Sequence, residues 1–256
     1  MTFYGFKSKE DEKKFALALE MCQSVFSGYY MNDMLCTFDR CLSFAKDDPF
    51  TEAFFRNASN DFERSRMWRL HVLTWAAAYA GSLPEGDFVE CGVLNGFSSA
   101  VVLDYLKDDQ GYDFHLFDTF EGIPDKYSTE SERKTLNEYY GKETMPDLVE
   151  FVRDRFSDYP NVFIHQGTLP DSLKKVHIKK VRLLHMDMNV AEAESLTLEA
   201  LWDRVVPGGI IVLDDYGHAV YDRLHLADKA VVEKHGHKAL ELPTGQGFII
   251  KGPDDA

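Results

Sequence analysis

Residues 208–218, GGIIVLDDYGH, indicate a buried strand that ends in two adjacent carboxylates. Residues 209–213 are apolar and mostly β-branched, which is typical of a strand that is covered on both faces. Asp214 and Asp215 follow directly. Because side chains alternate across a strand, one of these acids is expected to point back toward the protein, where an unpaired carboxylate is costly. The stretch therefore predicts an α/β core together with a partner that compensates this charge.

Helix capping is the simplest explanation for the two aspartates. Asp is a favoured N-cap residue, and residues 219–235 carry apolar side chains at helical spacing. One cap uses one aspartate, so the second requires a cation, a hydrogen-bond donor or a shifted pKa.

Strand-like and helix-like segments alternate on both sides of this stretch. This alternation predicts a mostly parallel, doubly wound α/β sheet, and the last two strands, joined by a short turn, would add one antiparallel strand. The expected strands lie at 87–93, 115–117, 162–165, 181–186, 209–213, 237–242 and 247–251, and the expected helices at 98–107, 146–156, 192–204 and 219–235.

Two segments fall outside this alternation. Residues 9–82 have helical spacing, with Asp61 as a candidate cap of the last helix, so we expect an N-terminal helical extension over 1–82 and the α/β domain over 83–256. Residues 121–142 are polar and charged, and we expect them to form either a mobile loop on the substrate side or a solvated insertion.

The composition disfavours several classes of protein. Of 256 residues, 43 are acidic and 28 are basic, and the resulting formal net charge of −15 would repel a nucleic-acid backbone. No apolar run reaches the roughly 20 residues of a membrane span. The first residues are charged rather than apolar, and the four cysteines have no metal-binding spacing. We therefore expect a cytoplasmic protein that binds neither nucleic acid nor membrane.

The first strand of the expected sheet is followed by a glycine-containing turn, in the run DFVECGVLNGFSS at residues 87–99. Gly92 permits a tight turn, and Gly96 allows a ligand to approach the next helix. The spacing is not the G-x-G-x-x-G of dinucleotide-binding proteins, and Glu90 would repel a pyrophosphate. An acid at this place suits a cationic group, such as the ammonium of an amino acid.

The second strand ends at Asp118, where an acid commonly binds ribose hydroxyls. A simple turn residue is the alternative explanation. A ligand that carries both an ammonium and a ribose points to S-adenosylmethionine more than to NAD.

Five runs together resemble the macrocin O-methyltransferase family: GDFVECGVLNGFSS, LFDTFEGIP, HQGTLPDSL, HMDMN and PGGIIVLDDYG. The resemblance covers about residues 60–250. Members of this family use S-adenosylmethionine, and characterised ones methylate sugar hydroxyls of macrolide and aminocoumarin antibiotics. The resemblance implies a class I methyltransferase (Rossmann-like) fold with a seven-stranded, mostly parallel sheet.

The resemblance also implies a divalent metal, typically magnesium, held by Asp187, Asp214 and Asp215. Elementary geometry is compatible with this, because neighbouring strands lie about 4.8 Å apart and their terminal carboxylates can converge on a hard cation. A metal there would lower the pKa of a bound hydroxyl, which a sugar alcohol needs before it attacks a methyl group.

The cofactor residues follow from the same match. We expect Glu90 and Gly92 near the methionine end, Asp118 near the ribose, and Gly167 and Thr168 on the adenine side. Further candidates from the matching runs are Val93, Asn95, Gly96, Ser98 and Thr119.

The sequence departs from the family in the block after Asp187. Many members carry a Tyr where this chain has Ala191, and many carry a second Asp where it has Asn189. The cofactor and metal residues are therefore expected to be intact, whereas the substrate side differs.

Two residues are candidates for the general base. Asp187 would lie beside the metal-bound hydroxyl, and His218 has a reference pKa of about 6.5 that suits a proton acceptor. The alternative to a catalytic role is that His218 faces solvent at the start of a helix. We expect His185 to be a core histidine with its hydrogen bonds satisfied, and His71 to pack between helices.

The sequence as a whole predicts an S-adenosylmethionine- and Mg²⁺-dependent O-methyltransferase that acts on a hydroxyl of a sugar or glycosylated small molecule. A homodimer or higher homo-oligomer is an open alternative to a monomer. Competing functions are a catechol-type metal-dependent O-methyltransferase, whose third ligand is usually Asn, and a non-catalytic S-adenosylmethionine-binding protein. A nicotinamide oxidoreductase is disfavoured because the G-x-G-x-x-G motif is missing.

Overall fold

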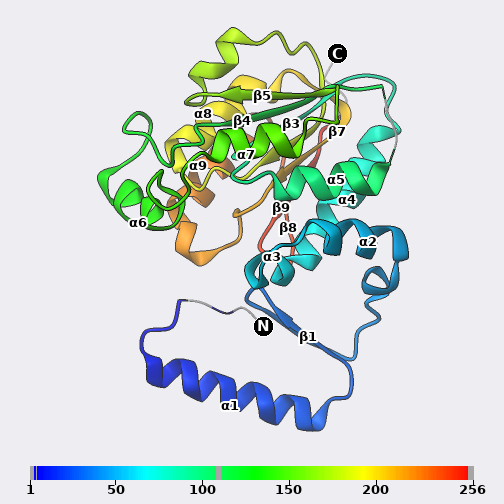
Figure 1. The fold of residues 1–256 in the computed structure, drawn as a ribbon, viewed down its shortest axis with the longest axis vertical. Coiled ribbons are helices and arrows are strands. Elements are labelled where there is room, and N and C mark those ends of the chain that lie inside the picture. The colour runs from blue at the N-terminus through cyan, green and yellow to red at the C-terminus, as the bar shows by residue number, and fades with distance from the viewer. Residues whose placement is uncertain (1–2, 4, 108–110, 253–256) are drawn as a thin grey trace.

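The computed structural model describes residues 3, 5–107 and 111–252. The remaining positions of the expected N-terminal extension (1–82) and α/β domain (83–256) lie outside the described residues. It contains a seven-stranded sheet with the order β5-β4-β3-β6-β7-β9-β8 (Figure 1). Strands β3 to β7 run parallel, and β9 is antiparallel to both of its neighbours. This confirms the expected fold class, including the antiparallel strand at the end. The strands are β3 (Asp87–Cys91), β4 (Phe114–Asp118), β5 (Val162–Gln166), β6 (Val181–Met186), β7 (Val205–Leu213), β8 (Leu240–Glu241) and β9 (Gly247–Ile250).

Helices cover both faces of the sheet, which explains why the central strands β3 and β6 are almost wholly buried. In β6, for example, Leu183 packs in the core on one face and its neighbour Leu184 packs in the core on the other. The first face carries α2 (Asp48–Asn57), α4 (Met67–Gly81), α5 (Phe97–Leu106) and α7 (Leu148–Arg155). The second carries η2 (Asp171–Lys175), α8 (Ala191–Trp202) and α9 (Asp222–Lys234).

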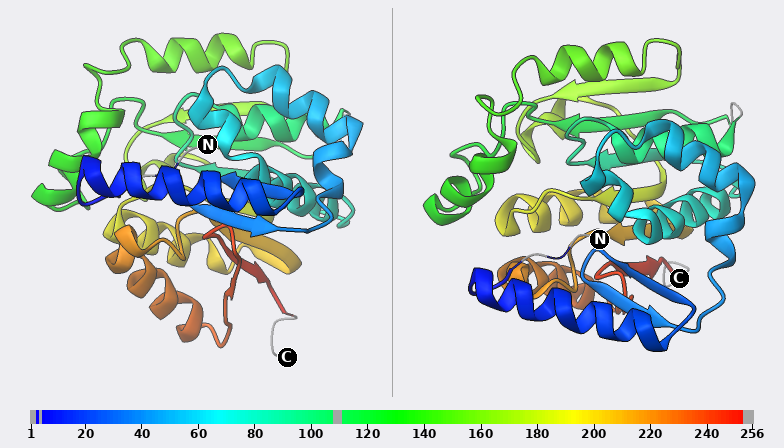
Figure 2. Two further views of the ribbon diagram at one scale, coloured as in Figure 1. Left: turned by 90° about the horizontal axis from the view of Figure 1, so that it is seen from below. Right: turned by 60° about the horizontal axis from the view of Figure 1, so that its bottom comes forward.

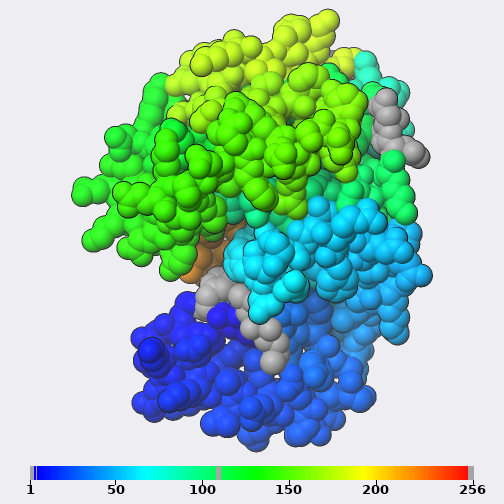
Figure 3. Space-filling view, viewed as in Figure 1, coloured from blue at the N-terminus to red at the C-terminus, as the bar shows by residue number. Residues whose placement is uncertain are grey.

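The N-terminal extension is not wholly helical, so the expectation for residues 9–82 is wrong at its centre. Between α1 (Lys9–Val25) and η1 (Ser43–Lys46), the strands β1 (Tyr29–Asn32) and β2 (Leu35–Phe38) form an antiparallel hairpin. Its two-residue turn, Asp33 and Met34, has φ values of 50° and 61°, as a type I′ turn requires. Met is an unusual residue for that conformation, which hides the turn from sequence reasoning. Figures 2 and 3 show α1 and the hairpin as a blue lobe beside the sheet domain.

The cap expected at Asp61 is also displaced by one residue. The side chain of Asn60, not Asp61, accepts a hydrogen bond at the start of α3 (Asp61–Ser65). A separate helix, α4, then begins at Met67 without a side-chain cap.

The polar segment 121–142 contains a helix, α6 (Glu130–Tyr140), rather than being a loop throughout. Thr129 and Glu132 form a capping box at its start. Leu136 is buried and packs with Val190 and Ala193 at the beginning of α8. The insertion is therefore anchored to the block that follows Asp187.

The expected helix 219–235 is divided into a short 3-10 turn, η3 (Ala219–Tyr221), and α9. Tyr221 occupies the N-cap position of α9, and no side chain caps this helix. Capping therefore does not explain Asp214 and Asp215. Among the helices in the described part of the chain, none combines the length and apolar character of a membrane span.

Candidate active site

The carboxyl ends of β3, β6 and β7 lie level with one another, because Cys91 pairs with Met186 and Met186 pairs with Leu213. Residues at or after the carboxyl ends of β3, β4, β5 and β6 line one cavity, whereas Asp214 and Asp215, which follow β7, are not among the described residues that line it. From the expected cofactor set, the cavity is lined by Gly92, Asp118, Thr119, Gly167 and Thr168, and from the expected metal set by Asp187. A ligand-binding position at this edge is typical of open α/β sheets.

Gly92 is required where β3 leaves the sheet. Its φ is 88°, and a Cβ at this position would lie 2.0 Å from the carbonyl oxygen of Asp187. Any side chain would therefore push apart the two strand ends that flank the cavity.

Asp118 holds the turn after β3 in place. Its Oδ2 accepts hydrogen bonds from the backbone amides of Val93 (2.8 Å) and Leu94 (2.9 Å), and its Oδ1 accepts one from Phe120 (2.7 Å). A ribose hydroxyl would share this carboxylate with the backbone. Asp118 thus ends β4, as expected, lines the cavity and has a structural role, while its expected contact with a ribose stays a prediction.

Other residues of the expected cofactor set are not among the described residues that line the cavity. Glu90 is one of them and is 2% exposed. The remaining four, Val93, Asn95, Gly96 and Ser98, occupy the turn and the first residues of α5, and none of them is among the described residues that line the cavity.

The partner of Glu90 is the buried His185. The Nδ1 of His185 lies 3.0 Å from Oε1 of Glu90, and its Nε2 lies 3.6 Å from Oδ1 of Asp214. Burial disfavours the charged imidazole, but the interactions with Asp214 and Glu90 outweigh it and raise the pKa of His185 to about 10. His185 is thus buried, as expected, but the expectation that its hydrogen bonds are satisfied is wrong for Nε2, which has no hydrogen-bond partner among the described residues. The raised pKa favours the charged imidazole between the two acids.

Asp214 and Asp215 are compensated by a guanidinium of the same chain. Both are buried, and NH1 of Arg69 donates to Oδ2 of Asp214 at 2.6 Å and to Oδ1 of Asp215 at 3.2 Å. Gln246 donates to the other oxygen of Asp214 (2.8 Å), and Asn189 donates to the other oxygen of Asp215 (2.5 Å). Although burial opposes ionisation, Arg69 and His185 hold the pKa of Asp214 well below its usual range.

Asp187 is less fully bonded than the other two aspartates. It lines the cavity, and its Oδ1 accepts a hydrogen bond from Asn189 at 3.1 Å. Burial, followed by repulsion from Asp214 and Asp215, raises the pKa of Asp187 to about 7. Ligand atoms of His185, Asp187 and Asp214 lie within 4.8 Å of one another.

The three aspartates fit a divalent cation in kind, because carboxylate oxygens are the ligands that Mg²⁺ and Ca²⁺ prefer. Of the three, Asp187 and Asp214 belong to the group of closely spaced ligand atoms. The guanidinium of Arg69 forms ion pairs with two of them, Asp214 and Asp215. This supports the binding of a cation at this position.

His218 is separated from this cavity. It contacts NH2 of Arg69 through its Nε2, and it lines a second pocket with Asp33, Thr244 and Gly245. Burial and the charge of Arg69 lower the pKa of His218. The two candidate bases therefore line different pockets.

Sequence reasoning missed Arg66, at the N-cap position of α4, and Arg69 within this helix. Arg69 is 3% exposed, and the buried Nε of Arg66 has no hydrogen-bond partner among the described residues, while its side chain lines the cavity. The signal that could have revealed them is two arginines three residues apart at the start of a mostly apolar helix, in the run RMWR at residues 66–69. His71, by contrast, stacks on Phe44, as expected for helix packing.

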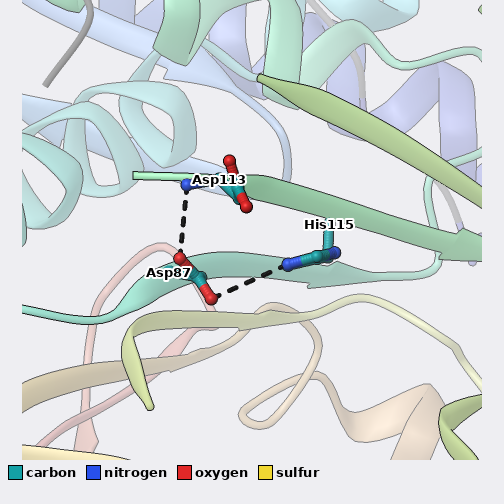
Figure 4. A group of neighbouring side chains, drawn as sticks. All are labelled: Asp87, Asp113 and His115. Carbon is teal, nitrogen blue, oxygen red and sulfur yellow. Dashed lines mark hydrogen bonds and ion pairs between the residues drawn. The ribbon is translucent and has the colours of Figure 1, made fainter. Parts of the chain in front are cut away.

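A second group of titratable side chains lies at the opposite end of the strands (Figure 4). The Nε2 of His115 is 3.7 Å from Oδ2 of Asp87, and the backbone amide of Asp113 donates to Oδ1 of Asp87 at 3.3 Å. These residues lie at the amino ends of β3 and β4, away from the cavity.

A model of the macrocin O-methyltransferase family matches residues 56–233. The chain belongs to this family. Members similar to it include the 8-demethyl-8-(2,3-dimethoxy-alpha-L-rhamnosyl)-tetracenomycin-C 4'-O-methyltransferase of Streptomyces olivaceus, with 30% identity over 55% of this chain. The demethyldecarbamoylnovobiocin O-methyltransferase of Streptomyces niveus is 28% identical over 53% of this chain.

These alignments span 57% and 55% of the lengths of the two relatives, so about half of each is matched. Among solved structures, the O-methyltransferase NovP is similar with a TM-score of 0.61 and 23% identity, covering 73% of this chain and 80% of NovP. This likeness supports the fold alone.

Proposed function

We propose that the protein is an S-adenosylmethionine-dependent O-methyltransferase that acts on a hydroxyl of a sugar or glycosylated small molecule. The observation that carries the proposal is one cavity at the carboxyl edge of the sheet that brings Gly92, Asp118 and Asp187 together. The names of the two relatives support the acceptor class, since one describes a rhamnosyl-bearing substrate and both describe O-methyl transfer.

For the cofactor, we propose that the ribose lies at Asp118 and the adenine side at Gly167 and Thr168, with Gly92 beside the methionine end. Glu90 would influence the cofactor site indirectly, because its carboxylate forms hydrogen bonds with Ser99 and His185 inside the sheet. We also propose the division into an N-terminal extension and an α/β domain at residue 82. A homodimer or higher homo-oligomer is a further proposal, which light scattering of the purified chain would test.

We further propose magnesium dependence, with Asp187, Asp214 and Asp215 as the residues that would hold the ion. A bound divalent cation would supply Lewis-acid activation of the acceptor hydroxyl. Methyl transfer is an in-line displacement at a sulfonium, so the chain must also align the acceptor oxygen and take up its proton. Asp187 is our candidate for that acceptor role because it faces the cavity, whereas His218 does not.

The test is a methyl-transfer screen over glycosides and phenols, run with Mg²⁺ and with EDTA. We expect turnover of glycosides that requires Mg²⁺. Full activity in EDTA would refute the metal dependence, and a preference for catechols would favour the catechol-type alternative. Binding of S-adenosylhomocysteine without turnover of any acceptor would favour a non-catalytic S-adenosylmethionine-binding protein.

A further inference from the structure

We propose that Arg69 is a built-in competitor of the metal ion at the aspartate cluster. Its guanidinium occupies Asp214 and Asp215 in the metal-free chain, and it withdraws to Asp33 when a divalent cation binds. The inference rests on the proposed function, because it takes these aspartates as the ligands of a divalent cation.

The position of the guanidinium decides the competition. NH1 of Arg69 lies 2.6 Å from Oδ2 of Asp214 and 3.2 Å from Oδ1 of Asp215, so one corner of the group touches both carboxylates. All three side chains are almost fully buried. Two positive charges at the same pair of carboxylates would repel strongly in such a poorly solvated place. A divalent cation that binds both aspartates must therefore displace NH1.

The remaining oxygens show where an ion can first approach. Both oxygens of Asp214 and both of Asp215 accept hydrogen bonds from side chains of the protein. Asp187 accepts one from Asn189 through Oδ1 and lines the open cavity. An ion that enters the cavity meets Asp187 first and completes its coordination only after Arg69 has moved.

Asp33 gives the displaced guanidinium a place to go. The Nε of Arg69 donates to Oδ2 of Asp33 at 2.6 Å, and this bond uses a different nitrogen from the bonds to Asp214 and Asp215. Asp33 lies in the turn of the β1–β2 hairpin and is 7% exposed. Arg69 can thus give up the two aspartates and keep one buried counterion.

A purely structural role for Arg69 leads to different expectations. If Arg69 only fastened the hairpin to the sheet, removing either Arg69 or Asp33 would loosen the site and weaken metal binding in both cases. Competition predicts effects of opposite sign. Loss of Arg69 frees the aspartates and tightens metal binding, whereas loss of Asp33 deprives the displaced guanidinium of its counterion and weakens metal binding.

The experiment measures Mn²⁺ affinity of the metal-free full chain by electron paramagnetic resonance, with no methyl acceptor present. A hydrogen bond between charged groups contributes about 1.5–3 kcal/mol, so we expect Arg69→Gln to bind Mn²⁺ about tenfold to a hundredfold more tightly. Asp33→Asn should bind Mn²⁺ more weakly than the unchanged chain. Arg64→Gln is the matched control, since Arg64 is exposed and its partners among the described residues are Asp61 and the carbonyl oxygen of Ala58.

Thermal unfolding provides a readout that is independent of activity. Without metal, Arg69→Gln should unfold at a lower temperature than the unchanged chain. Addition of Mn²⁺ should raise the unfolding temperature of Arg69→Gln by more than it raises that of the unchanged chain. If Arg69→Gln fails to fold, Asp33→Asn still tests the proposal, because Asn tolerates the φ of 50° at this turn.

The outcomes separate this inference from the proposed function. Equal or weaker Mn²⁺ binding by a folded Arg69→Gln, or tighter binding by Asp33→Asn, overturns the competition, as does an absence of binding in every variant. Tight binding by Arg69→Gln alongside methyl transfer that is indifferent to EDTA supports the competition and refutes only the magnesium dependence.

Discussion

Replacing Asp228 by Asn should stabilise the protein at neutral and alkaline pH. Asp228 lies on α9, has an exposed fraction of 0%, and neither of its carboxylate oxygens has a hydrogen-bond partner among the described residues. Its neighbour Glu194 on α8 is 1% exposed and accepts a hydrogen bond from the backbone amide of Met188. Two acids buried side by side cannot both ionise without a large penalty.

The size of the effect follows from the pKa of Asp228, which burial raises from 3.8 to about 7. Burial and the proximity of Asp228 likewise raise the pKa of Glu194 well above its usual range. A carboxyl with a raised pKa binds more protons in the folded than in the unfolded chain, so the free energy of unfolding decreases as the pH rises from about 4 to 7. At about 1.4 kcal/mol per pKa unit, the loss is on the order of 4 kcal/mol.

Urea unfolding at a series of pH values from about 4 to 8 provides the measurement. The difference in unfolding free energy between Asp228→Asn and the unchanged chain should grow with pH and level off above about pH 7. Asp203→Asn, at an exposed position after α8, is the control and should give a difference that is independent of pH. A constant difference for Asp228→Asn across the series would refute the reasoning.

Three further predictions concern the cavity. Gly92→Ala should lower the unfolding temperature and abolish binding of S-adenosylhomocysteine in calorimetry. The reason is that the alanine Cβ would lie 2.0 Å from the carbonyl oxygen of Asp187. Unchanged binding would show that the strand ends can separate. Asp118→Ala should weaken that binding by about 1–3 kcal/mol, since it removes the proposed partner of the ribose and frees three backbone amides. An unchanged affinity would place the ribose elsewhere. Asp187→Asn should abolish methyl transfer in a radiolabel assay and leave the calorimetric affinity for S-adenosylhomocysteine nearly intact; residual turnover near that of the unchanged chain would rule out Asp187 as the proton acceptor.

The sheet could be predicted because its signals are local. The run at 181–186 has apolar residues for both faces, such as Leu183 and Leu184, and the structure has β6 at Val181–Met186. The hairpin could not be predicted, because its turn depends on a left-handed conformation at Met34 that the residue type does not suggest.

The site was predictable only in part, for a similar reason. The sequence shows which acids follow the strands, and Asp118 and Asp187 do line the cavity. Whether an acid faces that cavity or a buried partner depends on residues far away in the chain. Glu90 is turned toward His185, 95 positions later, and Asp214 toward Arg69, 145 positions earlier.

The β1–β2 hairpin has a practical consequence for any shortened version of this chain. The family match begins at residue 56, after both the hairpin and Phe50 and Phe54, which are fully buried in the core. A chain started there would retain every family motif yet lose Asp33, the neighbour that holds Nε of Arg69. A recombinant fragment trimmed to the family boundary would therefore misreport the native site, and biochemical work should begin from the untrimmed polypeptide.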